Sequence, residues 1–216
     1  MSVVLRSGTY GNYYGSTMLT SSPCSSEQQK VNATYIYSYL SANGWTKESV
    51  AALLGNMQAE SSINPGRWQS DRVGGDSSGH GYGLCQWTPY TKYTEWAVNN
   101  GYSDYSVMDA NLSRILYEVK NKIQWYGTGS YSSMSFEDFS KSTEDVGYLA
   151  VGFLLCYERP ADQSESVQEY RSSLARNWYS YLGGVNPSNP SNPSSKKKKN
   201  KFKFILFNRR RRSVYG

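Results

Sequence analysis

Residues 55–66 read Gly55-Asn56-Met57-Gln58-Ala59-Glu60-Ser61-Ser62-Ile63-Asn64-Pro65-Gly66, and this stretch predicts where a helix ends. The apolar residues before and within it recur at helical spacing and define one face: Val50, Leu53, Leu54 and Met57. Continuing that face by three and four positions reaches Glu60 and Ser61. The Asn-Pro-Gly triplet then stops the helix. A carboxyl group is therefore expected on the apolar face of a helix, in its last turn.

Glu60 is a candidate general acid for two physical reasons. Desolvation on an apolar face disfavours the charged carboxylate, and so does the negative end of the helix dipole. A glutamate that keeps its proton near neutral pH can donate it to a substrate. The alternative interpretation is a surface glutamate in a fraying last turn, and the sequence that follows favours the first.

A glycine-rich polar segment over residues 71–83 follows this helix and leads into Gly-Leu-Cys-Gln-Trp-Thr-Pro at 83–89. Further along the chain, residues 157–160 read Tyr-Glu-Arg-Pro. Glu-Ser at a helix end, a flexible segment and then Gly-Leu-x-Gln is the pattern of the lysozyme and lytic-transglycosylase superfamily. From about residue 27 to 182, the chain closely resembles the phage tail lysozyme family, in particular the lysozyme domain of tail-knob proteins from small podoviruses.

The resemblance implies a muramidase, which cleaves the β-1,4 bond between N-acetylmuramic acid and N-acetylglucosamine in bacterial peptidoglycan. That reaction needs an acid to protonate the leaving oxygen and a group that stabilises oxocarbenium character. Glu60 is the expected acid. Lysozymes place the partner carboxylate in the segment after this helix, where Asp71 and Asp76 are both candidates. If neither serves, the same Glu60 fits a lytic transglycosylase, in which the substrate's own 6-hydroxyl closes an anhydro ring.

Four further residues are expected in the substrate cleft. Ser61, Gln86 and Tyr157 match family positions whose polar groups contact the N-acetyl sugars or steady the catalytic acid. Trp87 is expected either to stack on a sugar ring or to lie in the core. Glu158 is expected to form a structural ion pair with the arginine that follows it.

The periodicity predicts an α+β fold that is mainly helical. Five signals predict the starts of helices: Ser26-x-x-Gln29, Thr46, Thr88-Pro89, Ser106-x-x-Asp109 and Ser142-x-x-Asp145. A last helix is expected from about Glu165 to Leu182. The apolar helix over 146–157 is the candidate for a buried central helix. β structure is expected only between residues 71 and 86, and the resemblance implies a two-lobed lysozyme-like domain with a small hairpin beside a cleft.

Composition marks a flexible lead-in (1–25), an Asn-Pro-Ser linker (185–195) and a basic disordered tail (196–216). The resemblance implies that the part between them (26–184) is a lysozyme-like catalytic domain. The chain has 23 Lys and Arg against 17 Asp and Glu, but ten of the basic residues lie in the tail. The catalytic part is therefore slightly acidic. The tail is expected to bind anionic wall polymers or a membrane surface, with no specific nucleic acid as a partner, and the alternative is a solubilising tail.

The presence of three cysteines and one histidine limits which other enzyme classes the chain could belong to. They do not fit a disulfide framework or a zinc centre, and no metal or cofactor is expected. A cysteine amidase or peptidase would pair Cys24 or Cys85 with His80. Cys85 follows the histidine, the reverse of the papain-like order, and Cys24 lies in the lead-in without a helix N-terminus to activate it. A non-catalytic tail-tip module that binds glycan is the third hypothesis.

Neither a signal peptide nor an apolar stretch of membrane-spanning length is visible in the sequence. A wall-degrading enzyme then needs another route to its substrate. We expect assembly into a phage virion tail, with phage tail proteins as partners, or release at host lysis.

Overall fold

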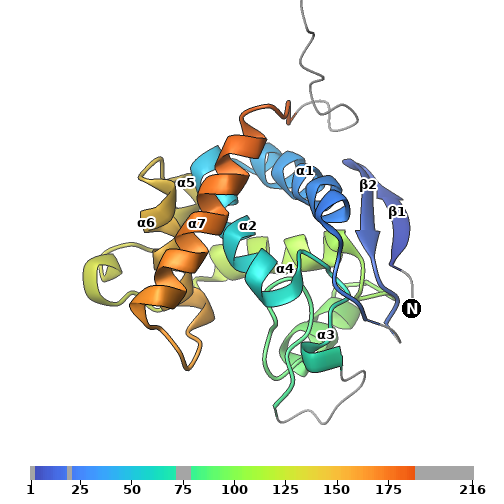
Figure 1. Cartoon of the computed structure of the whole chain (residues 1–216). Helices are drawn as coiled ribbons and strands as arrows, with labels where there is room; N and C mark the ends of the chain where they lie inside the picture. The colour runs from blue at the N-terminus through green and yellow to red at the C-terminus, as the bar shows by residue number, and fades with distance from the viewer. Residues whose placement is uncertain (1–2, 19–20, 72–78, 188–216) are drawn as a thin grey trace, which may run out of the picture.

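The computed structural model describes residues 3–18, 21–71 and 79–187. Within them the chain forms seven α-helices and one two-stranded antiparallel hairpin, so the prediction of a mainly helical α+β fold is confirmed (Figure 1). Asp76, most of the expected linker and the whole basic tail over 196–216 lie outside these ranges. No helix in the described part of the chain has the length and apolar character needed to cross a membrane.

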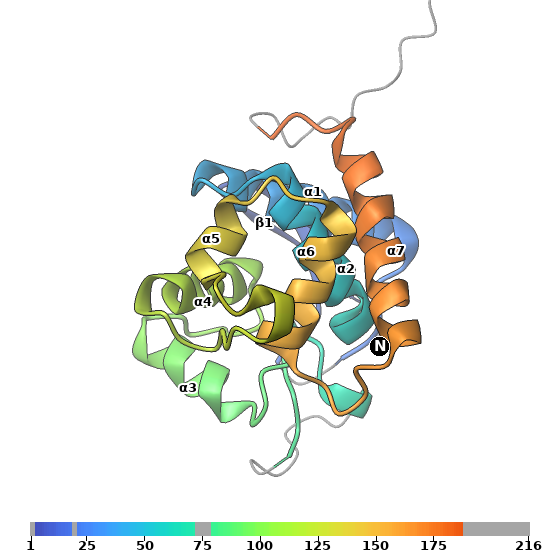
Figure 2. The same cartoon turned by 90° about the vertical axis from the view of Figure 1, so that its left-hand side faces the viewer.

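Helix α2 (Lys47–Ser61) is the centre of the fold. The Thr46 side chain caps it as predicted, and nine consecutive residues, 49–57, are buried. Helix α2 lies between α6 (Val146–Phe153) and α7 (Glu165–Leu182), and α1 (Ser26–Ala42) packs beside it (Figures 1 and 2). Six of the eight residues of α6 are buried as well. The prediction of a buried helix after Asp145 is therefore confirmed, and α2 is a second buried helix packed against it.

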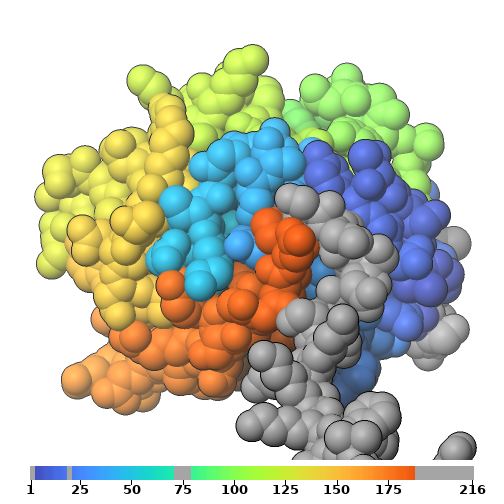
Figure 3. Space-filling model, turned by 90° about the horizontal axis from the view of Figure 1, so that it is seen from above, coloured from blue at the N-terminus to red at the C-terminus, as the bar shows by residue number. Residues whose placement is uncertain are grey.

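Gly55 allows α7 to approach α2 closely. A Cβ at this position would lie 2.7 Å from the backbone nitrogen of Ala175 and 2.9 Å from its Cα, both shorter than real contacts. Only glycine leaves room for a neighbouring backbone at that distance. Seen from above, α7 (orange) runs directly against the light-blue segment that enters α2 (Figure 3). This contact brings Arg171, one turn earlier on α7, to the end of α2.

The end of α2 follows the prediction from the Asn-Pro-Gly triplet. The helix stops at Ser61, and Ser62 and Ile63 adopt left-handed backbone with φ of 55° and 53°. The buried Asn64 side chain accepts the Gly66 N–H at 3.0 Å and donates to the Ser22 carbonyl at 2.6 Å. The helix terminus is thus fixed to the N-terminal segment rather than left to fray.

An N-terminal hairpin replaces the expected flexible lead-in. Strands β1 (Val4–Gly8) and β2 (Gly11–Gly15) pair in antiparallel register. The buried Asn32 side chain of α1 accepts the Tyr14 N–H and donates to the carbonyls of Tyr14 and Ile63, which ties β2 to α1 and to the end of α2. The prediction for residues 1–25 is therefore wrong over 4–15, because tertiary hydrogen bonds order a segment whose composition is typical of a loop.

The expected hairpin over 71–86 is not seen in the described part of that segment. Isolated bridges instead join Tyr82 to Trp68 and to Trp87. Residues 72–78 lie outside the description. The two-stranded hairpin that the described residues do contain is the N-terminal one, and the prediction of a hairpin beside the cleft is not tested over 72–78.

Several helix starts also differ from the predictions. The capping box of α1 is Ser25–Gln28, one residue earlier than predicted, and Asp145 rather than Ser142 caps α6. The remaining helices are α3 (Thr91–Asn99), which begins after Thr88-Pro89, α4 (Met108–Asn121), the unpredicted α5 (Phe136–Lys141), and α7, whose bounds match the prediction.

Candidate active site

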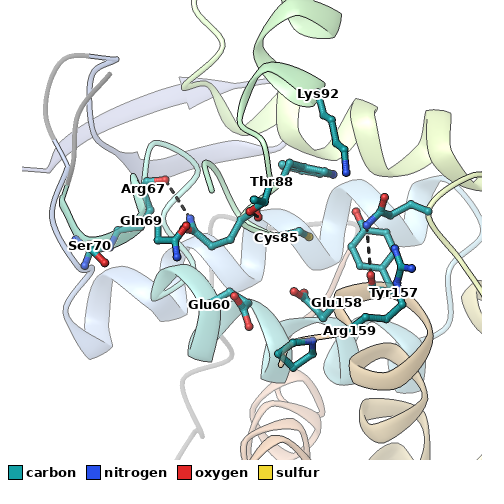
Figure 4. Close-up of a pocket in the computed structure, with 14 residues that line it drawn as sticks. Glu60, Arg67, Gln69, Ser70, Cys85, Thr88, Lys92, Tyr157, Glu158 and Arg159 are labelled. Carbon is teal, nitrogen blue, oxygen red and sulfur yellow. Dashed lines mark hydrogen bonds between the residues drawn. The ribbon is translucent and has the colours of Figure 1, made fainter. Parts of the chain in front are cut away.

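A pocket of about 400 Å³ opens at the C-terminal end of α2 (Figure 4). Five parts of the chain wall it: the last turn of α2, the segment over 67–70, the segment over 85–88, Lys92 of α3, and the turn over 157–160 with Gln124 beside it. That turn follows α6 directly, where the helix widens into a π-helical turn over Leu154–Glu158. Segments far apart in sequence thus meet at the C-terminal end of α2, the helix end that was predicted to carry the candidate acid.

Glu60 lines this pocket and forms an ion pair with Arg171 of α7. The guanidinium Nη2 lies 2.5 Å from Glu60 Oε1, and Nη1 donates to the Asn56 carbonyl at 2.8 Å. The Glu60 side chain is 21% exposed and that of Arg171 9%. The ion pair therefore orients the Glu60 carboxyl group at the end of α2, a contact that sequence reasoning did not predict.

Glu158 is a second carboxyl group of the pocket, and Figure 4 shows it on the opposite side from Glu60, with both side chains directed into the same space. Its Oε1 atom is buried and has no hydrogen-bond partner among the described residues. Burial raises the pKa of Glu158 well above the usual range of a glutamate, the charge of Glu60 raises it further, and Arg171 lowers it. This carboxyl group is thus held in a setting that favours its protonated form.

The expected ion pair between Glu158 and its neighbour is not formed. Arg159 adopts left-handed backbone with φ of 52°, and its guanidinium lies over the Tyr126 ring at 4.2 Å from the centroid. The left-handed residue turns the two side chains apart, which sequence adjacency alone could not predict.

A buried network under the pocket holds Trp87 and Tyr157. Glu118 of α4, fully buried, accepts the Trp87 Nε1–H at 3.0 Å, the Tyr157 hydroxyl at 2.5 Å and the Arg114 Nε–H at 2.8 Å. Trp87 also stacks on Tyr93 with the ring centroids 4.6 Å apart. At 3% and 1% exposure, Trp87 and Tyr157 support the pocket wall from the core.

Sequence reasoning missed Glu118, although a signal for it exists. Glu118 follows Leu112 and Ile115 at three-residue spacing, so it falls on the apolar face of α4. Burial raises its pKa, and the hydrogen bond from Tyr157 and the charge of Arg114 offset part of that rise.

Ser61 and Gln86 hold the walls of the pocket together. The buried Ser61 hydroxyl donates to the Leu84 carbonyl at 2.9 Å, and Ser61 itself is not among the residues that line the pocket. Gln86 does line it, and its Nε2 donates to the carbonyls of Arg67 and Gly83 at 3.1 and 2.9 Å. These contacts fix the segments over 67–70 and 83–88 against the end of α2.

The two predicted partner carboxylates are not placed by the described residues. Asp76 lies outside them, and for Asp71 the description covers only the backbone, in a short helical turn over Gln69–Asp71. Gln69 and Ser70 of the same turn line the pocket. The roles of Asp71 and Asp76 stay predictions.

The cysteines are in settings that disfavour a nucleophilic thiolate. All three are free and buried. Burial raises the pKa of Cys24 to about 12, that of Cys85 well above its usual value, and that of Cys156 as well. Cys85 lines the pocket but is only 5% exposed. A cysteine peptidase needs the opposite, a thiol with a lowered pKa.

Comparison with known proteins shows the family to which the chain belongs. The phage tail lysozyme family matches residues 31–182, and the chain belongs to this family. Membership in a lysozyme family suggests a glycoside hydrolase.

The chain is also similar to Morphogenesis protein 1 of Bacillus phage B103, with 46% identity over 160 residues. The match covers 74% of this chain but 41% of that relative, so the chain spans about two fifths of the length of the protein it matches.

Proposed function

We propose that the chain is a muramidase that hydrolyses the β-1,4 bond between N-acetylmuramic acid and N-acetylglucosamine of peptidoglycan. One observation carries the proposal: Glu60 ends the central helix in a polar pocket and is oriented there by Arg171, in a chain of the phage tail lysozyme family. Glu60 is the proposed acid, which gives its proton to the leaving glycosidic oxygen as the bond to the anomeric carbon breaks.

Features of the pocket other than Glu60 support a sugar polymer as the substrate. Arg67, Gln69 and Thr88 present polar groups to the pocket, and Lys92 lies above them in Figure 4. Gln86 also lines the pocket and is hydrogen-bonded to the Arg67 carbonyl. Hydroxyl and acetamido groups of sugars bind to such polar side chains through hydrogen bonds. The lactyl carboxylate of N-acetylmuramic acid would find cationic partners in the same pocket.

The proposed setting is the phage virion tail, with wall penetration as the task, and release at host lysis is the alternative. The proposed partners are bacterial peptidoglycan and phage tail proteins. For the basic tail we propose attachment to anionic wall polymers or a membrane surface, which added salt should weaken.

Digestion of purified peptidoglycan tests the reaction class. The fragments are analysed for their new ends after treatment with the wild-type protein. New reducing ends support the muramidase. Anhydro ends would replace it with a lytic transglycosylase, free amino groups with an amidase or peptidase, and absence of soluble fragments with a glycan-binding module.

A further inference from the structure

Glu158 and Glu60 occupy one pocket from opposite sides, and the charges around them do not balance if both are ionised. Glu60 comes from the end of α2 and Glu158 from the π-helical turn after α6. Arg171 is the cation of this group: it pairs with Glu60 and also acts on Glu158. Two carboxylates against one guanidinium leave an excess negative charge in a partly buried site, and a single proton removes it.

Arg67 and Lys92 also line the pocket, but neither is among the charges that act most strongly on Glu158. The other ionisable groups near Glu158 are Glu118 on α4, Cys85 in the segment over 83–88, and Tyr157 in the same turn. Arg159 is turned to the Tyr126 ring. Each of the three is either acidic or neutral, so none stabilises an ionised Glu158.

The Oε1 atom of Glu158 adds an independent observation. It is buried in the pocket wall and has no hydrogen-bond partner among the described residues. A buried ionised carboxylate with an unpaired oxygen is costly, whereas a protonated one can offer an O–H to a group in the pocket. The side chain is thus poised for a partner that enters from the pocket.

We propose that Glu158 is the second carboxyl group of the active site and that Glu60 and Glu158 hold one proton between them. The inference deepens the proposed function and rests on it for the reaction. In the resting site the proton is on Glu158, whose buried Oε1 has no other partner among the described residues, and it passes to Glu60, the acid that meets the substrate. Glu158 then acts through Glu60, as a positioning residue that keeps a proton available to it at neutral pH.

The proton balance of hydrolysis fits a pair that holds one proton. As the bond between the anomeric carbon and the glycosidic oxygen breaks, the pair gives its proton to the leaving oxygen. Water adds to the anomeric carbon and returns one proton to the pair. The site ends with the protonation with which it began, and one water molecule is consumed.

The pH profile of kcat/KM distinguishes this role from a structural one. The variants are Glu158→Gln, the conservative Glu158→Asp, and Glu137→Gln as a matched control on the exposed surface of α5. Without Glu158 the site lacks the carboxyl group that holds the shared proton, and Arg171 remains beside Glu60. We expect the alkaline limb of Glu158→Gln to move to lower pH by about one unit or more. Glu158→Asp should restore it in part, and the control should keep the wild-type limb.

A measurement on the wild-type protein needs no activity. Glutamate labelled with ¹³C at the side-chain carboxyl carbon is followed by NMR across pH, with Glu158→Asp used for assignment. We expect one carboxyl group of the pair to titrate well above the ordinary glutamate range and to be coupled to the other.

The two measurements separate the failure of this inference from that of the proposed function. An unshifted alkaline limb in an active Glu158→Gln variant, or a Glu158 signal that titrates in the ordinary glutamate range, would overturn the shared proton. A wild-type protein that cleaves no glycan would overturn the proposed function instead, while the NMR titration would still decide whether the pair exists. A limb shift produced by Asp71→Asn or Asp76→Asn, but not by Glu158→Gln, would assign the second carboxylate to that aspartate.

Discussion

Arg171 binds Glu60 with one guanidinium nitrogen and the carbonyl of Asn56 with another, so a single buried side chain of α7 joins two turns of α2. The contact depends on the close packing of Gly55 in α2 against Ala175, which lies one turn further along α7 than Arg171. Packing of the central helix and orientation of the proposed acid are therefore one structural feature.

Arg171→Met should destabilise the fold by about 2–4 kcal/mol, because it leaves the Glu60 carboxylate and the Asn56 carbonyl without their donor. The free energy of unfolding is measured in urea. Combining it with Glu60→Gln should recover part of the loss, since no partly buried charge then lacks a partner. If the losses in unfolding free energy of the two single variants simply add in the double variant, Arg171 and Glu60 have no coupling energy.

Gly55→Ala should destabilise the protein by about 1–3 kcal/mol, because the added methyl group meets the α7 backbone at Ala175. Gly79→Ala is the matched control, since a Cβ there meets nothing within 4 Å, and its effect should stay within about 0.5 kcal/mol. Thermal unfolding of both variants gives the comparison. Equal stability of the two variants would contradict this prediction, because α2 and α7 would then accommodate the methyl group without any loss of stability.

Glu118 should make the fold less stable as pH rises. Its pKa is raised in the folded protein, so the folded state holds the proton more tightly than the unfolded chain does. The contribution is full below the unfolded value, near pH 4.3, and is lost as pH rises through the folded value. Urea unfolding from pH 4 to 8 should show wild type losing stability relative to Glu118→Gln. A relative gain would mean that Arg114 keeps Glu118 ionised.

Thiol reagents should not inhibit the protein, because all three cysteines are buried and burial raises their pKa values. Under native conditions iodoacetamide should modify none of them within the time in which it modifies all three in urea. Activity loss that follows alkylation of Cys85 would reopen the cysteine-enzyme hypothesis.

Local sequence signals predicted the helix that carries Glu60, its cap at Thr46 and its stop at the Asn-Pro-Gly triplet. These depend on residues within a few turns of each other. Arg171 could not be paired with Glu60 in this way, since 111 positions separate them and only the packing of α7 on α2 brings them together.

The other misses have the same physical origin. The N-terminal hairpin is a short glycine-rich segment without an apolar core of its own. Hydrogen bonds from the Asn32 side chain of α1 to the Tyr14 backbone hold it in place. The sequence predicted an ion pair between Glu158 and Arg159. It is not formed, because the left-handed backbone at Arg159 directs the two side chains apart. Glu118 could have been found from its place on an apolar helix face, because a glutamate there needs buried donors.

Cleavage of purified peptidoglycan by wild type and by Glu60→Gln tests the central claim most directly. The amide keeps the shape of the side chain but cannot donate a proton as a carboxylic acid does. The account predicts that the variant still folds, still binds the polymer and releases new ends about 10²–10⁴ times more slowly than wild type. A Glu60→Gln protein that releases fragments at close to the wild-type rate would contradict it.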